Sequence, residues 1–169
     1  MSKAAVVKQE ADVRQYLTFL LGGEVFAVGI LAVKEIIEYV APTVVPLMPQ
    51  TVRGVINLRG AVLPVIDLSL RFGREPVAAG RRTCIIVVET LLQGERQTVG
   101  VLVDAVDAVL AVSAADLGPA PAFGARIRAD YISGIARIDG RFVILVDLDV
   151  VLALQDVLAL TEPAEQQAA

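Results

Sequence analysis

An internal repeat with a spacing of about 80 residues is the strongest constraint on how this chain folds. The stretch from Gly54 to Leu68 aligns without gaps on the stretch from Gly134 to Leu148. Each copy contains two apolar, β-branched runs around a short glycine-containing turn, which is typical of a β-hairpin. A repeat of this length is too long for a solenoid unit and fits two copies of a small barrel or sheet. The sequence therefore predicts a tandem duplication.

Turn and capping residues support the alignment of the two copies. The first predicted turn is Arg59-Gly60 and the second is Asp139-Gly140, and Asp-Gly tolerates the positive φ angles of a type I′ turn. Asp67 and Asp147 occupy equivalent positions after the hairpins. We expect each aspartate to cap a helix, a short one after Asp67 and a longer amphipathic one over residues 147–160.

Further strands are expected outside the repeated hairpins. Tyr16 to Val28 holds two apolar runs around Gly22-Gly23 and indicates another hairpin. A bend over residues 29–32 is expected to lead into a strand from Val33. Strands are also expected at residues 83–88 and 97–103 and, with a bulge, at 103–112. The predicted fold class is mainly all-β, built as two small barrels with short helices.

The expected domain organisation follows the repeat. Residues 1–14 are expected to form a flexible tail, residues 15–75 the first barrel and residues 83–150 the second barrel, with crossing-over of the chain termini between them. The segment between the barrels is polar and contains glycine and proline, which is typical of a linker. Residues 155–169 are expected to be the end of the C-terminal helix and a disordered tail.

Composition argues against several functional classes. The net charge is −4 and the basic residues are scattered, whereas a nucleic-acid partner requires a basic patch. No run of about 18 uncharged apolar residues occurs, so direct membrane insertion is not expected. The single Cys84 excludes an internal disulfide and indicates a reducing compartment.

Enzymatic activity is not expected either. Histidine is absent from the 169 residues, which removes the usual general base near neutral pH and most zinc sites. No Walker A motif or glycine-rich dinucleotide motif is present, and we expect no cofactor. Catalysis by carboxylates remains possible, and the candidate residues are Glu35, Asp67, Asp104, Asp107 and Asp147. Asp67 and Asp147 are better explained as helix caps.

Several motifs, in order along the chain, resemble the CheW family of chemotaxis coupling proteins. They are Tyr16–Val28, Val33–Ile36, Pro46–Pro49, Gly54–Leu68 with its Asn-Leu-Arg-Gly block, Val99–Asp104 and Gly134–Leu148. The resemblance extends over a domain of residues 15–154. It implies two intertwined, five-stranded SH3-like β-barrels with short helices and a C-terminal helix.

The resemblance also implies a function and partners. The implied function is that of a non-catalytic adaptor that couples methyl-accepting chemoreceptors to the histidine kinase CheA and scaffolds receptor–kinase arrays. The implied partners are the cytoplasmic tip of the receptor, the regulatory domain of CheA and, in array rings, other CheW copies. The implied location is the cytoplasm, with recruitment to receptor arrays at the membrane.

A receptor-binding groove is expected at the junction of the two barrels. A receptor tip is a helical hairpin, and a helix face needs an apolar groove with a few charges that fix its register. Glu35 and Arg59 are expected at the margin of this groove. The repeat position equivalent to Arg59 is Asp139, so the turn itself does not require arginine. The floor is expected to be formed by Val33, Ile85, Val103 and Val106.

Kinase contacts are implied on the apolar outer faces of both barrels. Phe123, in a proline-rich segment, is the candidate in the second barrel. The candidates in the first barrel are Val44, Val45 and Val62.

Alternative functions remain open at this point. One alternative within the same family is an adaptor of a non-flagellar chemosensory pathway that drives pilus motility or second-messenger output. An adaptor of the CheV type would carry an appended receiver domain, which is not expected here. Outside the family, the alternatives are an oligonucleotide-binding barrel and a hydrolase that uses two carboxylates with separated pKa values.

Overall fold

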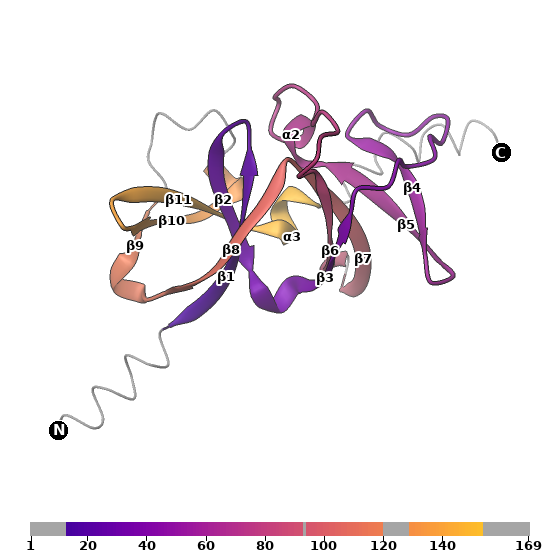
Figure 1. Ribbon diagram of the computed structural model, residues 1–169. Helices are drawn as coiled ribbons and strands as arrows, with labels where there is room; N and C mark the ends of the chain where they lie inside the picture. The colour runs from indigo at the N-terminus through magenta and orange to yellow at the C-terminus, as the bar shows by residue number, and fades with distance from the viewer. Residues whose placement is uncertain (1–12, 93, 120–128, 154–169) are drawn as a thin grey trace.

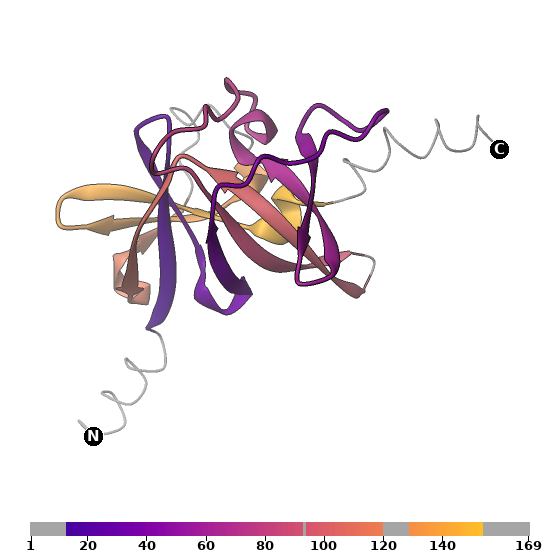
Figure 2. The same cartoon turned by 45° about the vertical axis from the view of Figure 1, so that its right-hand side comes forward.

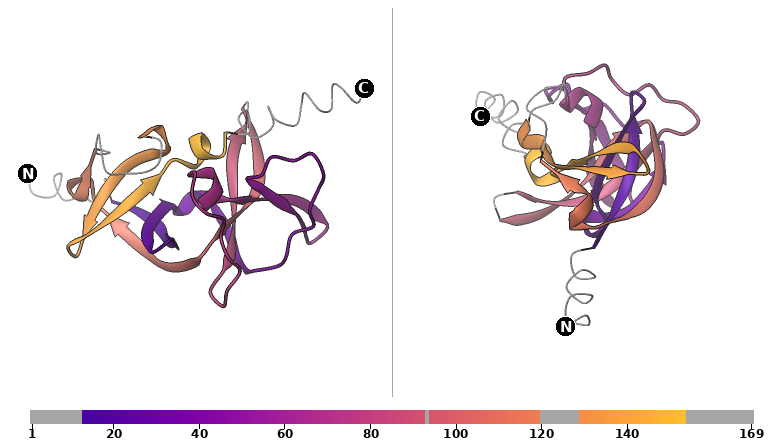
Figure 3. Two further views of the ribbon diagram at one scale, coloured as in Figure 1. Left: turned by 90° about the horizontal axis from the view of Figure 1, so that it is seen from above. Right: turned by 90° about the vertical axis from the view of Figure 1, so that its left-hand side faces the viewer.

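Two small β-barrels lie side by side in the protein (Figure 1). The computed structural model describes residues 13–92, 94–119 and 129–153. The expectations for residues 1–12, for the segment that contains Phe123 and for residues 154–169 lie outside these ranges. Seen from above, the two barrels form an elongated molecule with α3 (Leu148–Val151) between them (Figure 3).

Barrel 1 occupies the middle of the sequence. Its strands are β3 (Val33–Glu38), β4 (Val52–Leu58), β5 (Ala61–Asp67), β6 (Cys84–Leu92) and β7 (Glu95–Val103). Their spatial order is β3-β6-β7-β5-β4, and β5 and β7 run parallel. Thr43, after β3, exchanges two backbone hydrogen bonds of 2.9 Å with Val55 of β4. This bridge joins the two edges of the sheet and closes it into a barrel.

Barrel 2 is built from both ends of the chain. Its strands are β1 (Arg14–Leu21), β2 (Glu24–Gly29), β8 (Ala105–Val112), β9 (Leu117–Gly118), β10 (Ile132–Ile138) and β11 (Arg141–Val146). Their spatial order is β8-β1-β2-β11-β10-β9. The edge strands β8 and β9 are joined by η2 (Ala114–Asp116). Gly118 pairs with Ile135, the repeat equivalent of Val55, so barrel 2 has the same topology as barrel 1.

The two repeat units exchange hairpins. In barrel 1, Val65 of β5 pairs with Gly100 of β7, and in barrel 2 the equivalent Leu145 of β11 pairs with Ala27 of β2. The hairpin β1–β2 therefore completes the barrel of the second unit, and β6–β7 completes that of the first. Figure 2 shows β1 and β2 standing beside the late strands β8, β10 and β11. The exchange is the intertwining that the family resemblance implies.

The expected assignment of residues 15–75 and 83–150 to separate barrels needs correction. These ranges approximate the two repeat units along the sequence, but each barrel takes strands from both units. The cause is the pairing of β1 with β8 and of β3 with β6. Such contacts join residues far apart in the chain, and local periodicity carries no information about them.

The repeated hairpins are confirmed in detail. Arg59 and Asp139 both have φ of 51°, and each is followed by a glycine with positive φ. These angles are those of type I′ turns, whose twist matches that of the flanking strands. Both hairpins also contain a register shift at the same place, just before Gly54 and Gly134.

Both helices begin where the capping aspartates predict, but the second ends at Val151 with Leu152 as its C-cap, so the longer helix expected over residues 147–160 does not continue through residues 152–153. The Asp67 carboxylate accepts a hydrogen bond from the Leu70 N–H at the start of α2 (Leu68–Arg71). The Asp147 carboxylate accepts one from the Val150 N–H at the start of α3. The remaining short elements are η1 (Ile30–Ala32) and η3 (Ala129–Tyr131). In the described ranges no helix is long and apolar enough to span a membrane.

A shared core joins the barrels. One apolar cluster contains Phe19 and Phe26 of barrel 2 together with Ile66 and Ile85 of barrel 1, all without appreciable exposure. Phe72, which follows α2, packs its ring 5.3 Å from that of Phe26. Burial of this much apolar surface on both sides of one junction ties the barrels into a single folding unit.

Candidate functional site

Glu35 and Arg59 form an ion pair on the surface of barrel 1. Glu35 comes from β3 and Arg59 from the β4–β5 turn, at opposite edges of the sheet that the barrel closes. The exposed fraction of the side chain is 30% for Glu35 and 70% for Arg59. Both charges therefore remain accessible beside each other, and their place at the margin of a receptor groove stays a prediction. The pairing also gives the turn arginine a contact within the protein.

The four residues predicted for the groove floor, three valines and one isoleucine, differ in their burial. Val33 and Val106 are partly buried and pack against the core. Ile85 and Val103 are 0% exposed, and their side chains have no surface with which to contact a partner. Ile85 and Val103 are thus core residues and not the floor of an open groove. The reason is that both faces of the sheet are covered here, because residues 84–88 of β6 and 99–103 of β7 are buried at every position.

The predicted apolar surface of barrel 1 is exposed. Val44 and Val62 have exposed fractions of 78% and 65%, and Val45 is half-buried. Val44 adjoins Thr43, which pairs with β4, and Val62 lies on the neighbouring strand β5. We call Val44, Val45 and Val62 the barrel 1 patch. Their exposure makes the Val44 and Val62 side chains available for contact with a partner.

Barrel 2 carries a counterpart that sequence reasoning missed. Phe142 of β11 is the repeat equivalent of Val62 and is 65% exposed. Its ring lies 5.9 Å from the guanidinium carbon of Arg137, its partner on β10. Leu117 of β9 is also exposed, at 40%. Alignment of the two repeats was the signal that could have identified Phe142, because it places Phe142 on Val62.

Open clefts lie along the junction of the barrels. One of them, of about 510 Å³, is lined by residues of β1, η1, β6 and α3, among them Thr90 and Asp149. Asp149 accepts hydrogen bonds from the Thr90 hydroxyl at 2.8 Å and from the Leu91 N–H at 3.1 Å. Leu31 of η1, at its edge, is 98% exposed. The bend over residues 29–32 was predicted, but this exposure was not.

The carboxylates and the cysteine have structural settings. Asp67 and Asp147 cap separate helices, which removes the main support for a hydrolase that uses them together. Cys84 is buried, and this burial raises the pKa of its thiol above the ordinary value. A raised pKa keeps the thiol protonated, and a protonated thiol is a weak nucleophile. Cys84 therefore acts as a small core residue.

Comparisons with known proteins agree on one family. Residues 15–156 match the CheW-like domain. The chemotaxis protein CheW of Rhizobium meliloti is 38% identical over 143 residues, which cover 85% of this chain and 90% of that protein. CheW of Klebsiella aerogenes is 35% identical over 143 residues, 85% of this chain and 84% of that protein.

A solved structure agrees at the level of the fold. The crystal structure of the scaffolding protein TtCheW from Thermoanaerobacter tengcongensis has a TM-score of 0.73 and 33% sequence identity to this chain, and the match covers 82% of this chain and 91% of that one. Family match, sequence identity and the two SH3-like barrels together lead to one conclusion: the chain belongs to the CheW family.

Proposed function

We propose that the protein is a non-catalytic chemotaxis scaffold that couples methyl-accepting chemoreceptors to the histidine kinase CheA. The observation that carries the proposal is the presence of two separate kinds of surface on one molecule. Exposed apolar side chains lie on each barrel, Val44 and Val62 on barrel 1 and Phe142 on barrel 2, and an accessible pair of opposite charges lies at the β3 edge of barrel 1. A scaffold needs such separable surfaces, because it must hold two partners at once.

The barrel 1 patch is proposed as a contact for the regulatory domain of CheA, which resembles CheW itself. Val44 and Val62 expose branched apolar side chains that gain free energy when a partner removes them from water. Phe142 offers an equivalent aromatic anchor on barrel 2, and aromatic residues are enriched among residues that dominate binding energy. Phe123 stays a proposal from the sequence alone.

Glu35 and Arg59 are proposed as receptor contacts, with the half-buried Val33 and Val106 supplying apolar surface. Arg59 has φ of 51°, a left-handed conformation that costs a residue with a Cβ atom about 1–2 kcal/mol. Asparagine, aspartate or glycine would occupy this turn position at lower cost. The turn conformation therefore does not explain the arginine. We propose that its positive charge pairs with Glu35 and contacts a helical partner.

The receptor surface is tested by Arg59→Glu. We expect unchanged affinity for CheA and a loss of receptor-dependent kinase activation of at least tenfold, because the variant places two carboxylates where a cation and an anion stood. The loss in the free energy of unfolding should stay below about 1 kcal/mol, since the pair is exposed. The measurement is phosphotransfer from CheA in reconstituted receptor complexes.

Arg96→Glu is the matched control. Arg96 is 77% exposed, and its guanidinium lies 3.9 Å from the Glu89 carboxylate on the neighbouring strand, so the variant loses a similar surface ion pair. We expect Arg96→Glu to retain full receptor-dependent kinase activation. Equal losses in both variants would show that surface charge in general, and not Arg59, is responsible, and would count against the proposed receptor contact.

The kinase surface is tested by Val62→Glu. Calorimetric titration against the isolated regulatory domain of CheA from the same genome should show saturable one-to-one binding for the unchanged protein. The affinity should be at least tenfold weaker for the variant, because a charge would have to be desolvated in an apolar contact. Val109→Glu, at a 51% exposed position of barrel 2, is the control and should bind normally. Absence of binding by the unchanged protein would overturn the proposed function.

A further inference from the structure

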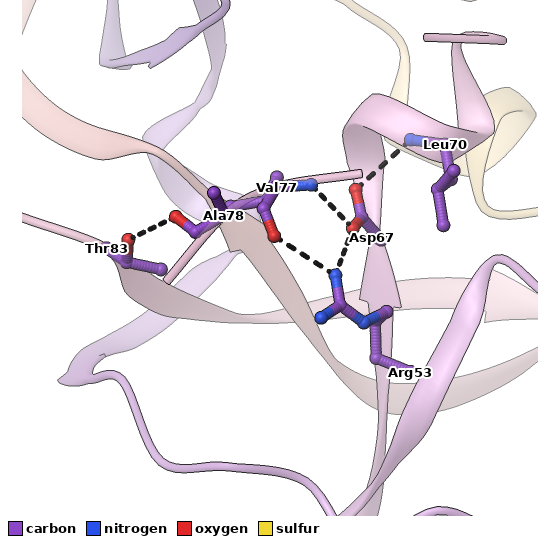
Figure 4. A network of polar contacts seen from close by, with 6 residues as sticks. All are labelled: Arg53, Asp67, Leu70, Val77, Ala78 and Thr83. Atoms are coloured by element: carbon purple, nitrogen blue, oxygen red, sulfur yellow. Dashed lines mark hydrogen bonds and ion pairs between the residues drawn. The ribbon is translucent and has the colours of Figure 1, made fainter. Parts of the chain in front are cut away.

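The linker of residues 72–83, between α2 and β6, is fastened to barrel 1 by a buried polar network (Figure 4). Asp67 accepts hydrogen bonds at the same carboxylate oxygen from the Val77 N–H at 2.9 Å and from Arg53 Nη1 at 2.7 Å. Arg53 also donates to the Val77 carbonyl at 3.2 Å. The Asp67 side chain has no exposed surface and that of Arg53 is 31% exposed, so water competes little for the bonds at the carboxylate and more for those at the guanidinium.

The second repeat shows that helix capping does not require this network. Asp147 caps α3 and is only half-buried. The position equivalent to Arg53 is Ser133, whose hydroxyl donates to the Leu145 carbonyl at 3.2 Å. Arg53 is therefore an addition to the cap in the first repeat, and its bonds to Asp67 and to the Val77 carbonyl help to fix the linker.

From this fixed linker, Arg74 reaches across to barrel 2. Arg74 Nη2 lies 2.8 Å from Glu24 Oε1, at the start of β2. The guanidinium carbon also lies 5.4 Å from the centre of the buried Phe26 ring. The Arg74 side chain is only 20% exposed, which places its charge in a more restricted environment than that of an ordinary surface ion pair.

A second contact holds the same hairpin from the other side. Asp104, between β7 and β8, accepts a hydrogen bond at 2.7 Å from the N–H of Gly22 in the β1–β2 turn. The Asp104 N–H donates to the Leu20 carbonyl at 3.1 Å. Gly22, Glu24, Arg74 and Asp104 line one cleft of about 510 Å³ at the junction. The exchanged hairpin is thus held at its tip by groups on both sides of the cleft.

We propose that Arg74 is a positioning residue that sets the orientation of barrel 2 relative to barrel 1. The hydrogen bonds of Asp67 and Arg53 fix the linker, and the linker carries Arg74. Arg74 in turn forms an ion pair with Glu24 of the β1–β2 hairpin, which belongs to barrel 2. The apolar surfaces at Val62 and Phe142 lie on different barrels, so their relative placement depends on this orientation. The role in signalling rests on the proposed function, whereas the mechanical role does not.

The mechanical part is tested by charge exchange. Glu24→Arg and Arg74→Glu each place like charges together, and the double variant restores an opposite pair. In a Cys84→Ala background, spin labels on cysteines introduced at Glu95 and Asp107 measure the distance between the barrels. We expect a distance distribution at least twice as broad in either single variant and the original width in the double variant. Arg82→Gln, an exposed arginine of the same linker, is the control and should change nothing.

The signalling part uses the same variants in the complete receptor–kinase complex. Each single variant should lose at least threefold in receptor-dependent kinase activation while it keeps its affinity for the regulatory domain of CheA, and the double variant should recover activation. An unchanged distance distribution in the single variants, or no recovery in the double variant, would overturn the proposal. A broadened distribution with full activation would overturn the signalling role. If the unchanged protein fails to bind CheA, the proposed function fails, while the distance measurement still decides the mechanical role.

Discussion

Gly54 and Gly134 occupy equivalent positions in the repeat but differ in the space around them. Gly54 has φ of 145°, and a Cβ atom there would lie 2.3 Å from the Thr43 carbonyl oxygen. At Gly134 the closest atom would be the Gly118 carbonyl oxygen at 3.3 Å. The bridge that closes barrel 1 therefore passes directly over Gly54, and only a residue without a side chain permits it.

Gly54→Ala should accordingly be far more damaging than Gly134→Ala. We expect Gly54→Ala to lower the free energy of unfolding by more than about 2 kcal/mol, because a backbone clash adds to an unfavourable φ. Gly134→Ala should cost about 1 kcal/mol or less. Urea denaturation of both variants gives the comparison, and equal losses would contradict the role of Gly54 in barrel closure.

The two capping aspartates provide a second contrast between equivalent residues. Asp67→Asn keeps a capping oxygen but leaves Arg53, which is 31% exposed, without its anionic partner. The expected loss in the free energy of unfolding is about 2–3 kcal/mol, reduced from that of a fully buried pair because Arg53 retains contact with water. Asp147→Asn should cost less than about 0.5 kcal/mol, since asparagine caps helices well. A similar cost at both positions in urea denaturation would show that capping alone matters.

At the scale of elements, the hairpins were predictable because their signals are local. A β-branched run, a glycine-containing turn and a second run specify a hairpin within about 15 residues, and β4–β5 and β10–β11 form where expected. The exposed faces were less predictable. Residues 84–88 of β6 form a continuous apolar run in which all five residues are buried, so no alternation distinguished Ile85 in the core from a residue on a surface.

The β4–β5 turn combines a conformational cost with a charge, and the two can be separated. Arg59→Asn should raise the free energy of unfolding by about 0.5 kcal/mol, because asparagine favours positive φ and the lost ion pair is exposed. Receptor-dependent activation should nevertheless fall. Asp139→Asn in the equivalent turn should change neither quantity appreciably. A loss of stability of more than about 1 kcal/mol for Arg59→Asn would show that the contact with Glu35 has a structural role.

At the scale of the whole molecule, the exchange of hairpins makes the two barrels interdependent. Sequence periodicity located the strands but not their partners, because pairing of β1 with β8 depends on contacts between residues about 90 positions apart. One apolar cluster spans the junction and contains residues of both barrels, and barrel 2 also holds a smaller buried cluster of Ala27, Val112, Ala136, Val143 and Leu145. The repeat suggested two subdomains, and the larger cluster joins them, so we expect the barrels to unfold together.

Thermal unfolding should therefore occur in a single transition. Calorimetry is expected to show one endotherm with equal calorimetric and van't Hoff enthalpies. Phe72→Ala should lower the free energy of unfolding by about 3–4 kcal/mol, because the Phe72 ring contacts Phe26 at 5.3 Å and Tyr131 at 6.1 Å, and should keep the transition single. Two resolved endotherms in this variant would show that the barrels unfold independently.

The chain order of the strands has a consequence for synthesis. A ribosome releases the N-terminus first, so all strands of barrel 1 are available once Val103 has emerged. The β1–β2 hairpin cannot pair with β11 until that strand, which ends at Val146, has also been synthesised. At about 5–20 residues per second, this wait lasts a few seconds. During that time Leu17, Phe19 and Phe26, all buried in the finished protein, have no barrel 2 to enter. The nascent hairpin is then an apolar segment that a chaperone can bind, and the rate of translation beyond Val103 sets how long it stays exposed.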